Sequence, residues 1–432
     1  MRRPQLAEFM KRMESDSVAI IPSASEAYRS NDSNYRYRQD SDFYYLTGFD
    51  EPESIAVVAP SREQRYTLFV RPRDPEREIW DGRRTGVDGA ISQYGADAAF
   101  PITEFREKLG DIINNTTNLY YRIGAPGNAE LDEMIVAEMR RMRILGRKKI
   151  NPPQAIIDAG TILHEMRLIK SDEEIEIMQR AADIASEAHV EAMKTAKPGM
   201  KEYEIEALVE YIFRRSGAYA PAYTSIVGAG ANATVLHYIH NDGVLRDGEL
   251  LLIDAGAEYR GYASDITRTF PINGRFTKAQ RDIYDLVLET QMACVEMVRP
   301  GTRGDELKDR SIEMLTEGMV RLGLLKGEPK KLIEEEKYKQ FYMHGLGHFL
   351  GLDVHDVGRY YEKDESRKLE PGMVMTVEPG LYIAPDTKDI PDQYRGIGVR
   401  IEDDVLVTQN GPRVLSKRAP KQPEEIEELM AR

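Results

Sequence analysis

The chain has 432 residues, of which 41% are hydrophobic and 31% are charged, and its formal net charge is −14. It is long enough for two or three globular domains, and its acidic balance argues against a nucleic-acid binder, which would present a basic face. The only cysteine is Cys294, so no intrachain disulfide can form. No run has the length of a membrane span and the N-terminal segment lacks the apolar run of a signal peptide, so a cytoplasmic protein is expected.

Residues 1–164 are predicted to form one α/β domain. Three short runs rich in β-branched residues, at 17–24, 54–60 and 65–72, end at Pro or Ser, as buried strands often do. Residues 132–145 have the spacing of a helix.

Residues 165–432 are predicted to form a second domain, most of it as two related halves. A long helix begins after Ser171, which opens a Ser-x-x-Glu capping box, and a second helix follows at about 202–215. The same order recurs after Thr277, which opens a Thr-x-x-Gln box, with a further helix at about 303–322. A Lys/Arg-Pro-Gly turn joins the helices of each pair, which favours an internal repeat. Chance similarity of two helical hairpins is the alternative.

Two strand-like runs within residues 249–270 each carry an aspartate. A turn centred on Tyr259 and Arg260 would place Asp254 opposite Asp265, with Cβ atoms about 5 Å apart on one face. Like charges at that distance destabilise a sheet unless a cation lies between them, and a carboxylate after the apolar run LLLI needs a partner. The pattern favours a cation site; the alternative is another register with both aspartates in solvent.

Two later strand-like runs and a glycine-rich segment supply further candidate ligands. Glu378 ends an apolar run within 372–383, and Glu402 lies among apolar neighbours within 396–408. The segment HGLGHFLGLDVHDVG (344–358) holds three of the seven histidines, and its glycines oppose a helix and allow close backbone approach. One histidine with four carboxylates suits a pair of Mn, Co or Fe ions better than a structural zinc.

Three other histidines, His164, His189 and His240, are not expected to bind metal or take part in catalysis. HEMRL (164–168) begins like a zincin motif but has Leu168 where the second histidine must be. His164 and His189 lie in predicted helices and are interpreted as residues of the helix surface. His240 precedes Asn-Asp-Gly and is interpreted as a turn residue.

These residues together resemble a known family, the dinuclear metallopeptidases with the pita-bread fold. That family includes methionine aminopeptidase, prolidase and Xaa-Pro aminopeptidase (aminopeptidase P). Residues 344–358, 370–383 and 398–404 resemble the last two in particular. DSDFYYLTGFDEPESIAVV (40–58) and EIWDGRRTG (78–86) look like the N-terminal domain of Xaa-Pro aminopeptidases. The likeness covers nearly the whole chain.

The resemblance implies an α/β (α+β) protein of two domains. Residues 1–164 would form the N-terminal aminopeptidase P-type domain, used for oligomerisation and substrate gating. Residues 165–432 would form the pseudo-symmetric pita-bread catalytic domain, with two divalent ions between its halves. Manganese is the usual ion in this branch, with cobalt, iron or zinc as alternatives.

The family's five metal ligands match five residues of this chain in order: Asp254, Asp265, His348, Glu378 and Glu402. By this analogy Asp254 and one oxygen of Asp265 bind one metal. His348, Glu378, Asp265 and Glu402 complete the pair, and Asp265 and Glu402 are the bridging ligands. Arg400 would not bind metal itself but would orient the carboxylate of Glu402 or Asp265.

The implied activity is release of the N-terminal residue from peptides with proline at the second position, by a hydroxide that bridges the two metals. Glu378 would take the proton of the water and pass it toward the leaving nitrogen. His237 and His344 resemble the family's non-ligand histidines and would stabilise the tetrahedral intermediate.

The resemblance also suggests residues that bind substrate. His355 would contact the residue after the scissile bond, and Tyr223 and Tyr382 are candidates for the walls of a proline pocket. Trp80 matches an aromatic residue that, in the resembling aminopeptidases, reaches the site of a neighbouring subunit in a homotetramer. The alternative is that Trp80 packs in the core of its own domain.

Three other functions remain open. Prolidase, which cuts Xaa-Pro dipeptides only, shares the metal ligands, although the runs YYLTGF and WDGRRTG favour the aminopeptidase. Methionine aminopeptidase lacks such an N-terminal domain. A non-catalytic pita-bread module that binds peptides is remote, because none of the five ligands is missing. The expected partners are peptides with an N-terminal Xaa-Pro sequence and further copies of this chain, with neither nucleic acid nor membrane.

Overall fold

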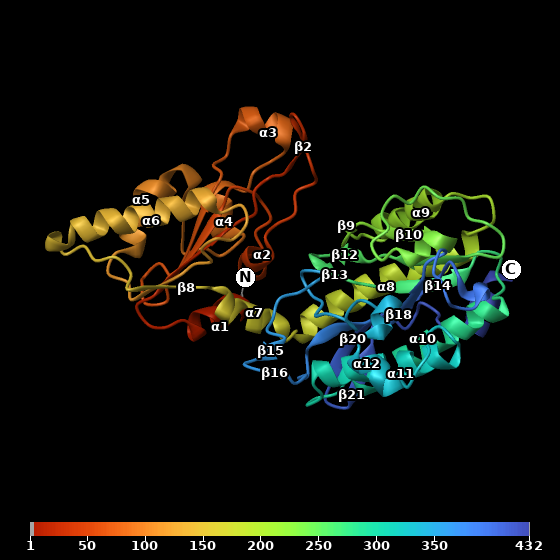
Figure 1. The fold of residues 1–432 in the computed structure, drawn as a ribbon. Helices are drawn as coiled ribbons and strands as arrows, with labels where there is room; N and C mark the ends of the chain where they lie inside the picture. The colour runs from red at the N-terminus through yellow and green to blue at the C-terminus, as the bar shows by residue number, and fades with distance from the viewer. Residues whose placement is uncertain (1–3, 432) are drawn as a thin grey trace. The chain divides into compact units, whose positions relative to one another are not determined.

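The computed structural model describes residues 4–431 and divides into two compact units, the first ending at Arg167 and the second beginning at Leu168 (Figure 1). No helix in this described range is long and apolar enough to cross a membrane. The first unit contains α1 (Pro4–Arg12), β1 (Val18–Pro22), β2 (Tyr28–Ser30), β3 (Ser33–Asn34), α2 (Ser41–Thr47), β4 (Ile55–Val58), β5 (Tyr66–Val70), α3 (Pro75–Asp81), α4 (Gly86–Ser92), β6 (Ala98–Pro101), α5 (Phe105–Ile113), β7 (Asn118–Tyr120), α6 (Ala129–Ile144), β8 (Ala155–Ile157) and α7 (Gly160–Leu168).

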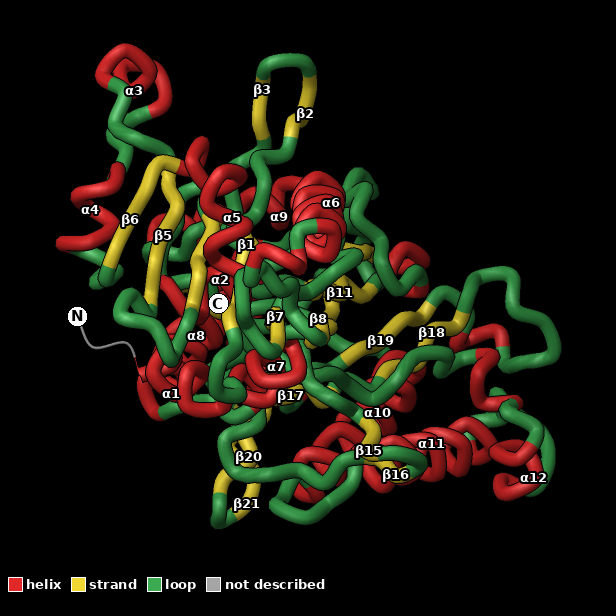
Figure 2. Tube along the Cα trace, turned by 90° about the vertical axis from the view of Figure 1, so that its left-hand side faces the viewer, coloured by secondary structure: helices red, strands yellow, loops and turns green. Residues whose placement is uncertain are grey.

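The first unit is built on a six-stranded sheet in the order β6-β5-β4-β1-β7-β8 (Figure 2). Side chains of β1 alternate between two cores: Val18 and Ile20 pack with α5 and α6, whereas Ala19 and Ile21 pack with α1, α2, α4 and α7. Both faces are therefore buried, which explains the continuous apolar runs. The three strands and the helix predicted for this part are β1, β4, β5 and α6.

The second unit alternates helix pairs with small antiparallel sheets. Its elements are α8 (Asp172–Thr195), α9 (Glu202–Arg215), β9 (Ala220–Pro221), β10 (Ile226–Ala229), β11 (Leu250–Asp254), β12 (Ala257–Tyr259), β13 (Tyr262–Ala263), β14 (Thr267–Pro271), α10 (Lys278–Met297), α11 (Gly304–Arg321), α12 (Pro329–Glu334), β15 (Tyr361–Glu362), β16 (Glu365–Ser366), β17 (Val374–Val377), β18 (Gly380–Ile383), β19 (Ile397–Arg400), β20 (Asp403–Thr408), β21 (Gly411–Val414) and α13 (Pro423–Met430).

The predicted internal repeat is visible in this order. The first half has the pair α8 and α9 and the sheet β10-β11-β14, and the second half has α10 and α11 and the sheet β17-β20-β21. In Figure 1, α10 and α11 run side by side. Both predicted capping boxes form: Ser171 with Glu174 at α8, and Thr277 with Gln280 at α10.

The predicted register of the aspartate hairpin is wrong by two residues. The turn between β12 and β13 consists of Arg260 and Gly261, both with positive φ (51° and 83°), as a two-residue hairpin turn requires. Asp254 is consequently paired with Thr267 instead of Asp265. A shift of two residues keeps each side chain on its face of the sheet, so the aspartates can still approach each other.

Two histidines expected on helix surfaces are not there. His189 is fully buried in α8, and its Nε2 lies 3.1 Å from the carbonyl oxygen of Ala255, directly after Asp254. The cause is tertiary: strands β12 and β13 cover this side of α8. His164 is half-buried, with Nε2 3.2 Å from a carboxylate oxygen of Asp42.

His189 makes stability depend on pH. Burial and the charge of Arg268 lower the pKa of His189 to about 4, from an ordinary value of 6.5. The unfolded chain therefore binds the proton more readily, and stability is lost as the pH falls from 6.5 toward 4. In metal-free protein, wild type should lose roughly 2 kcal/mol relative to His189→Gln between about pH 7 and pH 5, measured by urea unfolding. The glutamine amide can still donate to Ala255. A difference independent of pH would contradict a neutral buried imidazole.

Candidate active site

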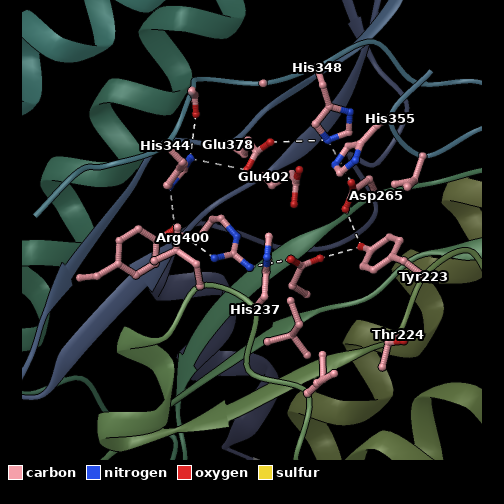
Figure 3. A pocket seen from close by; sticks show the side chains of 18 residues that line it. Tyr223, Thr224, His237, Asp265, His344, His348, His355, Glu378, Arg400 and Glu402 are labelled. Carbon is pink, nitrogen blue, oxygen red and sulfur yellow. Dashed lines mark hydrogen bonds and ion pairs between the residues drawn. The ribbon is translucent and has the colours of Figure 1, made fainter. Parts of the chain in front are cut away.

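One cavity of about 440 Å³ in the second unit collects most of the chemically active side chains predicted from the sequence (Figure 3). Its carboxylates stand where strands end or break: Asp254 closes β11, Asp265 lies between β13 and β14, Glu378 between β17 and β18, and Glu402 between β19 and β20. Because the strands end or are interrupted at these residues, their side chains need not alternate between the two faces of a sheet. They belong to both halves of the unit, so neither half contains the set alone.

The backbone around His348 explains the glycines beside it. The amides of Thr376 and Glu378 donate to the carbonyl oxygens of His348 and Leu346, at 2.9 and 2.8 Å, so this segment lies against β17. A Cβ on Gly347 would lie 2.0 Å from the Thr376 carbonyl oxygen. Only glycine permits this approach, as the sequence suggested.

The five predicted ligands are close together. His348 Nε2 lies 3.3 Å from Asp265 Oδ2 and 3.6 Å from Glu378 Oε1. Asp265, His348 and Glu402 each offer one ligand atom, and these atoms lie within 4.8 Å of one another. The Tyr223 hydroxyl lies 2.6 Å from Asp254 Oδ1 and 2.5 Å from Asp265 Oδ1, which joins Asp254 to the group.

The electrostatics of this group call for cations. Burial raises the pKa of Asp254, although the charge of Arg400 opposes the rise. Burial and the charges of neighbouring carboxylates also raise the pKa of Glu378 to about 7 and that of Glu402 well above its ordinary value. Burial lowers the pKa of His348, but the hydrogen bond and charges of the carboxylates outweigh it and raise that pKa to about 9. Like charges crowded in a buried site favour protonation unless cations lie between them.

The donor set fits divalent metal ions. His348 Nδ1 lies 3.0 Å from the Phe349 carbonyl oxygen; donation there leaves the lone pair of Nε2 facing the carboxylates. The hydroxyl of Thr267 donates to Glu402 at 2.7 Å and fixes that carboxylate. One imidazole with four carboxylates suits Mn, Co, Fe or Zn in a paired site.

Arg400 links the ligands to a non-ligand histidine. Its guanidinium pairs with Asp254 at 2.5 Å, whereas the sequence suggested Glu402 or Asp265 as the partner. It also donates to the Tyr382 hydroxyl at 3.0 Å, and that hydroxyl lies 2.8 Å from His344 Nε2. Burial and the charge of Arg400 lower the pKa of His344 to about 4, so this imidazole is neutral at pH 7.

Tyr223 and Tyr382 line the cavity, as expected for walls of a proline pocket, but their hydroxyl groups also bond to charged neighbours. Both residues therefore have a polar role that the sequence did not reveal. Burial raises the pKa of Tyr382 to about 12, so its hydroxyl keeps its proton at neutral pH.

His237 and His355 line the same cavity from exposed loop positions. The ring of His355 stands edge-on to that of His348, with centroids 4.4 Å apart. Its loop is anchored by the next residue, because Asp356 forms a buried ion pair with Lys170 at 3.0 Å.

Trp80 belongs to the first unit, on the short helix α3, and is 86% exposed. This excludes the alternative in which Trp80 packs in the core of its own unit. Its neighbour Ile79 is exposed as well, so α3 presents two large apolar side chains together.

The sequence did not point to three polar residues that organise the site. Arg268 is fully buried, pairs with Asp403 at 2.7 Å and donates to the carbonyl oxygen of Glu402 at 2.5 Å. Asp404 accepts a hydrogen bond from the amide of Asp265 at 3.1 Å. The run Glu-Asp-Asp at 402–404 was the available signal, because three acidic residues among apolar neighbours each need a partner.

Comparisons with known proteins agree along nearly the whole chain. The sequence model of metallopeptidase family M24 matches residues 176–409, and that of the aminopeptidase P N-terminal domain matches residues 2–120. Xaa-Pro aminopeptidase of Escherichia coli is 47% identical over 99% of this chain and 96% of its own. Human Xaa-Pro aminopeptidase 3 is 38% identical over 96% of this chain and 81% of its own.

Solved structures agree with these relatives. Aminopeptidase PepP of Pseudomonas aeruginosa superposes with a TM-score of 0.96 at 50% identity, covering 99% of this chain and 96% of that one. A zinc-substituted aminopeptidase P of E. coli in complex with product gives 0.95 at 46% identity, covering 100% and 98%. The expected fold, an N-terminal α/β domain followed by a pita-bread domain, is confirmed.

The crowded carboxylates predict metal uptake. After its metal has been removed with a chelator, the protein should bind two divalent ions. Binding should release protons, because the metals displace those held by Glu378 and His348. Uptake should weaken from about pH 8 to pH 6, because protons then compete for these groups. At 100 times its dissociation constant, each ion should stabilise the fold by about 2.7 kcal/mol.

Elemental analysis and thermal unfolding check this prediction. Asp265→Asn should lose metal, whereas the matched control His344→Ala, which changes a non-ligand in the same cavity, should keep both ions. An Asp265→Asn protein that retains two ions would refute the ligand assignment.

Proposed function

Because this chain belongs to metallopeptidase family M24 and carries the aminopeptidase P N-terminal domain, we propose that it removes the N-terminal residue from peptides whose second residue is proline. The observation that carries the proposal is the convergence of four carboxylates and one histidine in a cavity that also holds three non-ligand histidines. The relatives named above provide the substrate class.

The metal centre is assigned to the five predicted ligands, with Mn²⁺ as the preferred ion. Asp254, Asp265, His348, Glu378 and Glu402 would hold two ions, with Asp265 and Glu402 shared. When bound, such ions lower the pKa of water and polarise the carbonyl group under attack. Support comes from the raised carboxylate pKa values and from the orientation of the His348 ring.

Glu378 is the general base of the proposed reaction. Its carboxylate lines the cavity beside His348, where it could accept the proton of a metal-bound water. It accepts a hydrogen bond from the Thr376 hydroxyl at 3.3 Å, which holds one oxygen while the other stays available. The proton then passes to the leaving nitrogen of proline, which has no N–H of its own in the peptide.

Neutral and cationic groups around the cavity would bind the reacting peptide. The neutral imidazole of His344, whose Nε2 lies 2.8 Å from the Tyr382 hydroxyl, would act with His237 as a hydrogen-bonding group for charge on the carbonyl oxygen. His355 would contact the residue after the scissile bond. The Tyr223 and Tyr382 rings would bound the proline ring, and Arg400 would hold Asp254 in place.

A peptide panel tests the proposed specificity. Ala-Pro-Ala should be cleaved between Ala and Pro with kcat/KM at least about 10-fold above that of Ala-Ala-Ala, because a shaped pocket favours the proline ring. The dipeptide Ala-Pro should be the poorer proline substrate. Preference for the dipeptide would support prolidase, and metal-loaded protein that cleaves none of the three would support a binding module.

The proposal includes a homo-oligomer, a dimer or tetramer, in which Trp80 reaches a neighbouring subunit. Its exposure beside Ile79 supports this, because a tryptophan buries a large area with few rotamers to restrict. We also assign the chain to the cytoplasm, since its only cysteine, Cys294, is free and buried.

Trp80→Ala tests the assembly. Loss of an interface anchor costs about 2 kcal/mol or more, so subunit association should weaken about 30-fold, measured by sedimentation. The matched control is Tyr211→Ala, which removes an exposed aromatic side chain from α9 of the second unit. A wild-type protein that sediments as a monomer while fully active on Ala-Pro-Ala would exclude the cross-subunit role.

A further inference from the structure

Glu202 is a fully buried carboxylate that none of the site assignments uses. It is the first residue of α9, and both of its oxygens are occupied. Oε1 accepts from the Ala229 amide at 2.7 Å and from Asn232 Nδ2 at 2.9 Å. Oε2 accepts from the Gly243 amide at 2.6 Å and from the Tyr238 hydroxyl at 2.9 Å. A charged group with four donors is strongly held in place.

The four donors belong to the two sides of one loop. The chain leaves β10 at Ala229, passes through residues 230–242 and returns at Gly243. His237 stands at the exposed tip of this loop, where the loop lines the cavity. Glu202 therefore closes the base of the loop that presents His237.

A second tether holds the returning side to β10. Buried Asn241 accepts from the Val227 amide and donates to the Ser225 carbonyl oxygen, both at 2.9 Å. Between these ties Val235 and Ile239, on either side of His237, are exposed. Tyr238 directly follows His237 and donates its hydroxyl to Glu202, so the tip is tied to the base of the loop.

The geometry at this base requires a carboxylate. A glutamine there would offer one acceptor oxygen and an N–H₂ group, which would face at least one N–H donor of the loop. A Cβ at Gly243 would lie 2.8 Å from both Glu202 oxygens, so residue 243 cannot move inward or carry a side chain. Buried donors that lose their acceptor cost free energy, so the loop would shift to recover partners.

We propose that Glu202 is a positioning residue, which sets the place of His237 over the cavity by binding both sides of the loop 230–242. The inference rests on the proposed function through the role of His237. Displacement of a substrate-binding group by about 1 Å lowers the rate by up to about 10²-fold, so the loop base controls turnover although it touches no substrate.

The test compares Glu202→Gln with the matched control Glu204→Gln, an exposed glutamate of the same helix whose carboxylate accepts from the amide of Lys201. With metal-loaded enzyme and Ala-Pro-Ala, Glu202→Gln should lower kcat/KM by about 10- to 100-fold, and the control should change it less than about 2-fold. Hydrogen exchange of residues 229–243 should become faster in Glu202→Gln alone. If that variant does not fold, Tyr238→Phe removes a single donor and should lower kcat/KM by a smaller factor in the same direction.

A double variant separates positioning from general loss of structure. If Glu202 acts through His237, adding Glu202→Gln to His237→Ala should lower kcat/KM by less than about 2-fold further, because the group that it positions is already absent. Equal losses in both backgrounds, or unchanged hydrogen exchange, would overturn the inference. Wild type that cleaves no peptide would refute the proposed function instead, and hydrogen exchange would still decide whether Glu202 holds the loop.

Discussion

The structure of the second unit depends on holding four carboxylates together inside one cavity. Asp254, Asp265, Glu378 and Glu402 repel one another, and burial raises this cost, as the raised pKa values of Asp254, Glu378 and Glu402 record. Two neighbouring side chains reduce that repulsion. His348 carries a positive charge in the metal-free site and Arg400 pairs with Asp254. Divalent cations bound between the carboxylates would relieve this repulsion.

A separate set of charges holds the strands that carry these ligands. Arg268 on β14 pairs with Asp403 on β20, and Lys421 reaches the second Asp403 oxygen at 2.6 Å. The pair is buried, so removing either partner would leave an uncompensated charge in the core. Because β14 and β20 belong to different halves, the ion pair fastens the internal repeat at the place where Asp265 and Glu402 must meet. Burial would raise the pKa of Asp403, but the charges of Arg268 and Lys421 outweigh it and lower that pKa, so the carboxylate is ionised and paired with these two cations.

The candidate metal ligands and the two loop histidines of the cavity, His237 and His355, are supported differently. The carboxylates stand at strand ends, where the sheets fix them, whereas His237 and His355 lie on loops. Both loops are tied at the base by buried polar side chains: Glu202 for the loop of His237, and the pair Lys170–Asp356 for the loop of His355. Exposed tips on buried anchors leave room for a peptide while limiting the positions that the imidazoles can take. The sheets therefore fix the candidate ligands, whereas buried anchors at the loop bases hold the two loop histidines.

Most elements and the candidate metal ligands could be predicted from the amino-acid sequence, because both are marked by local patterns. Apolar runs marked the strands, Ser171 and Thr277 marked helix starts, and acidic residues directly after apolar runs marked the site. The hairpin register was missed because it depends on which two residues take positive φ, and the burial of His189 because it depends on strands far along the chain. Tertiary structure alone decided that Arg400 pairs with Asp254 and that Glu202 binds both sides of a loop. These partners lie far apart in the sequence, so their contacts form only when the folded chain packs them together.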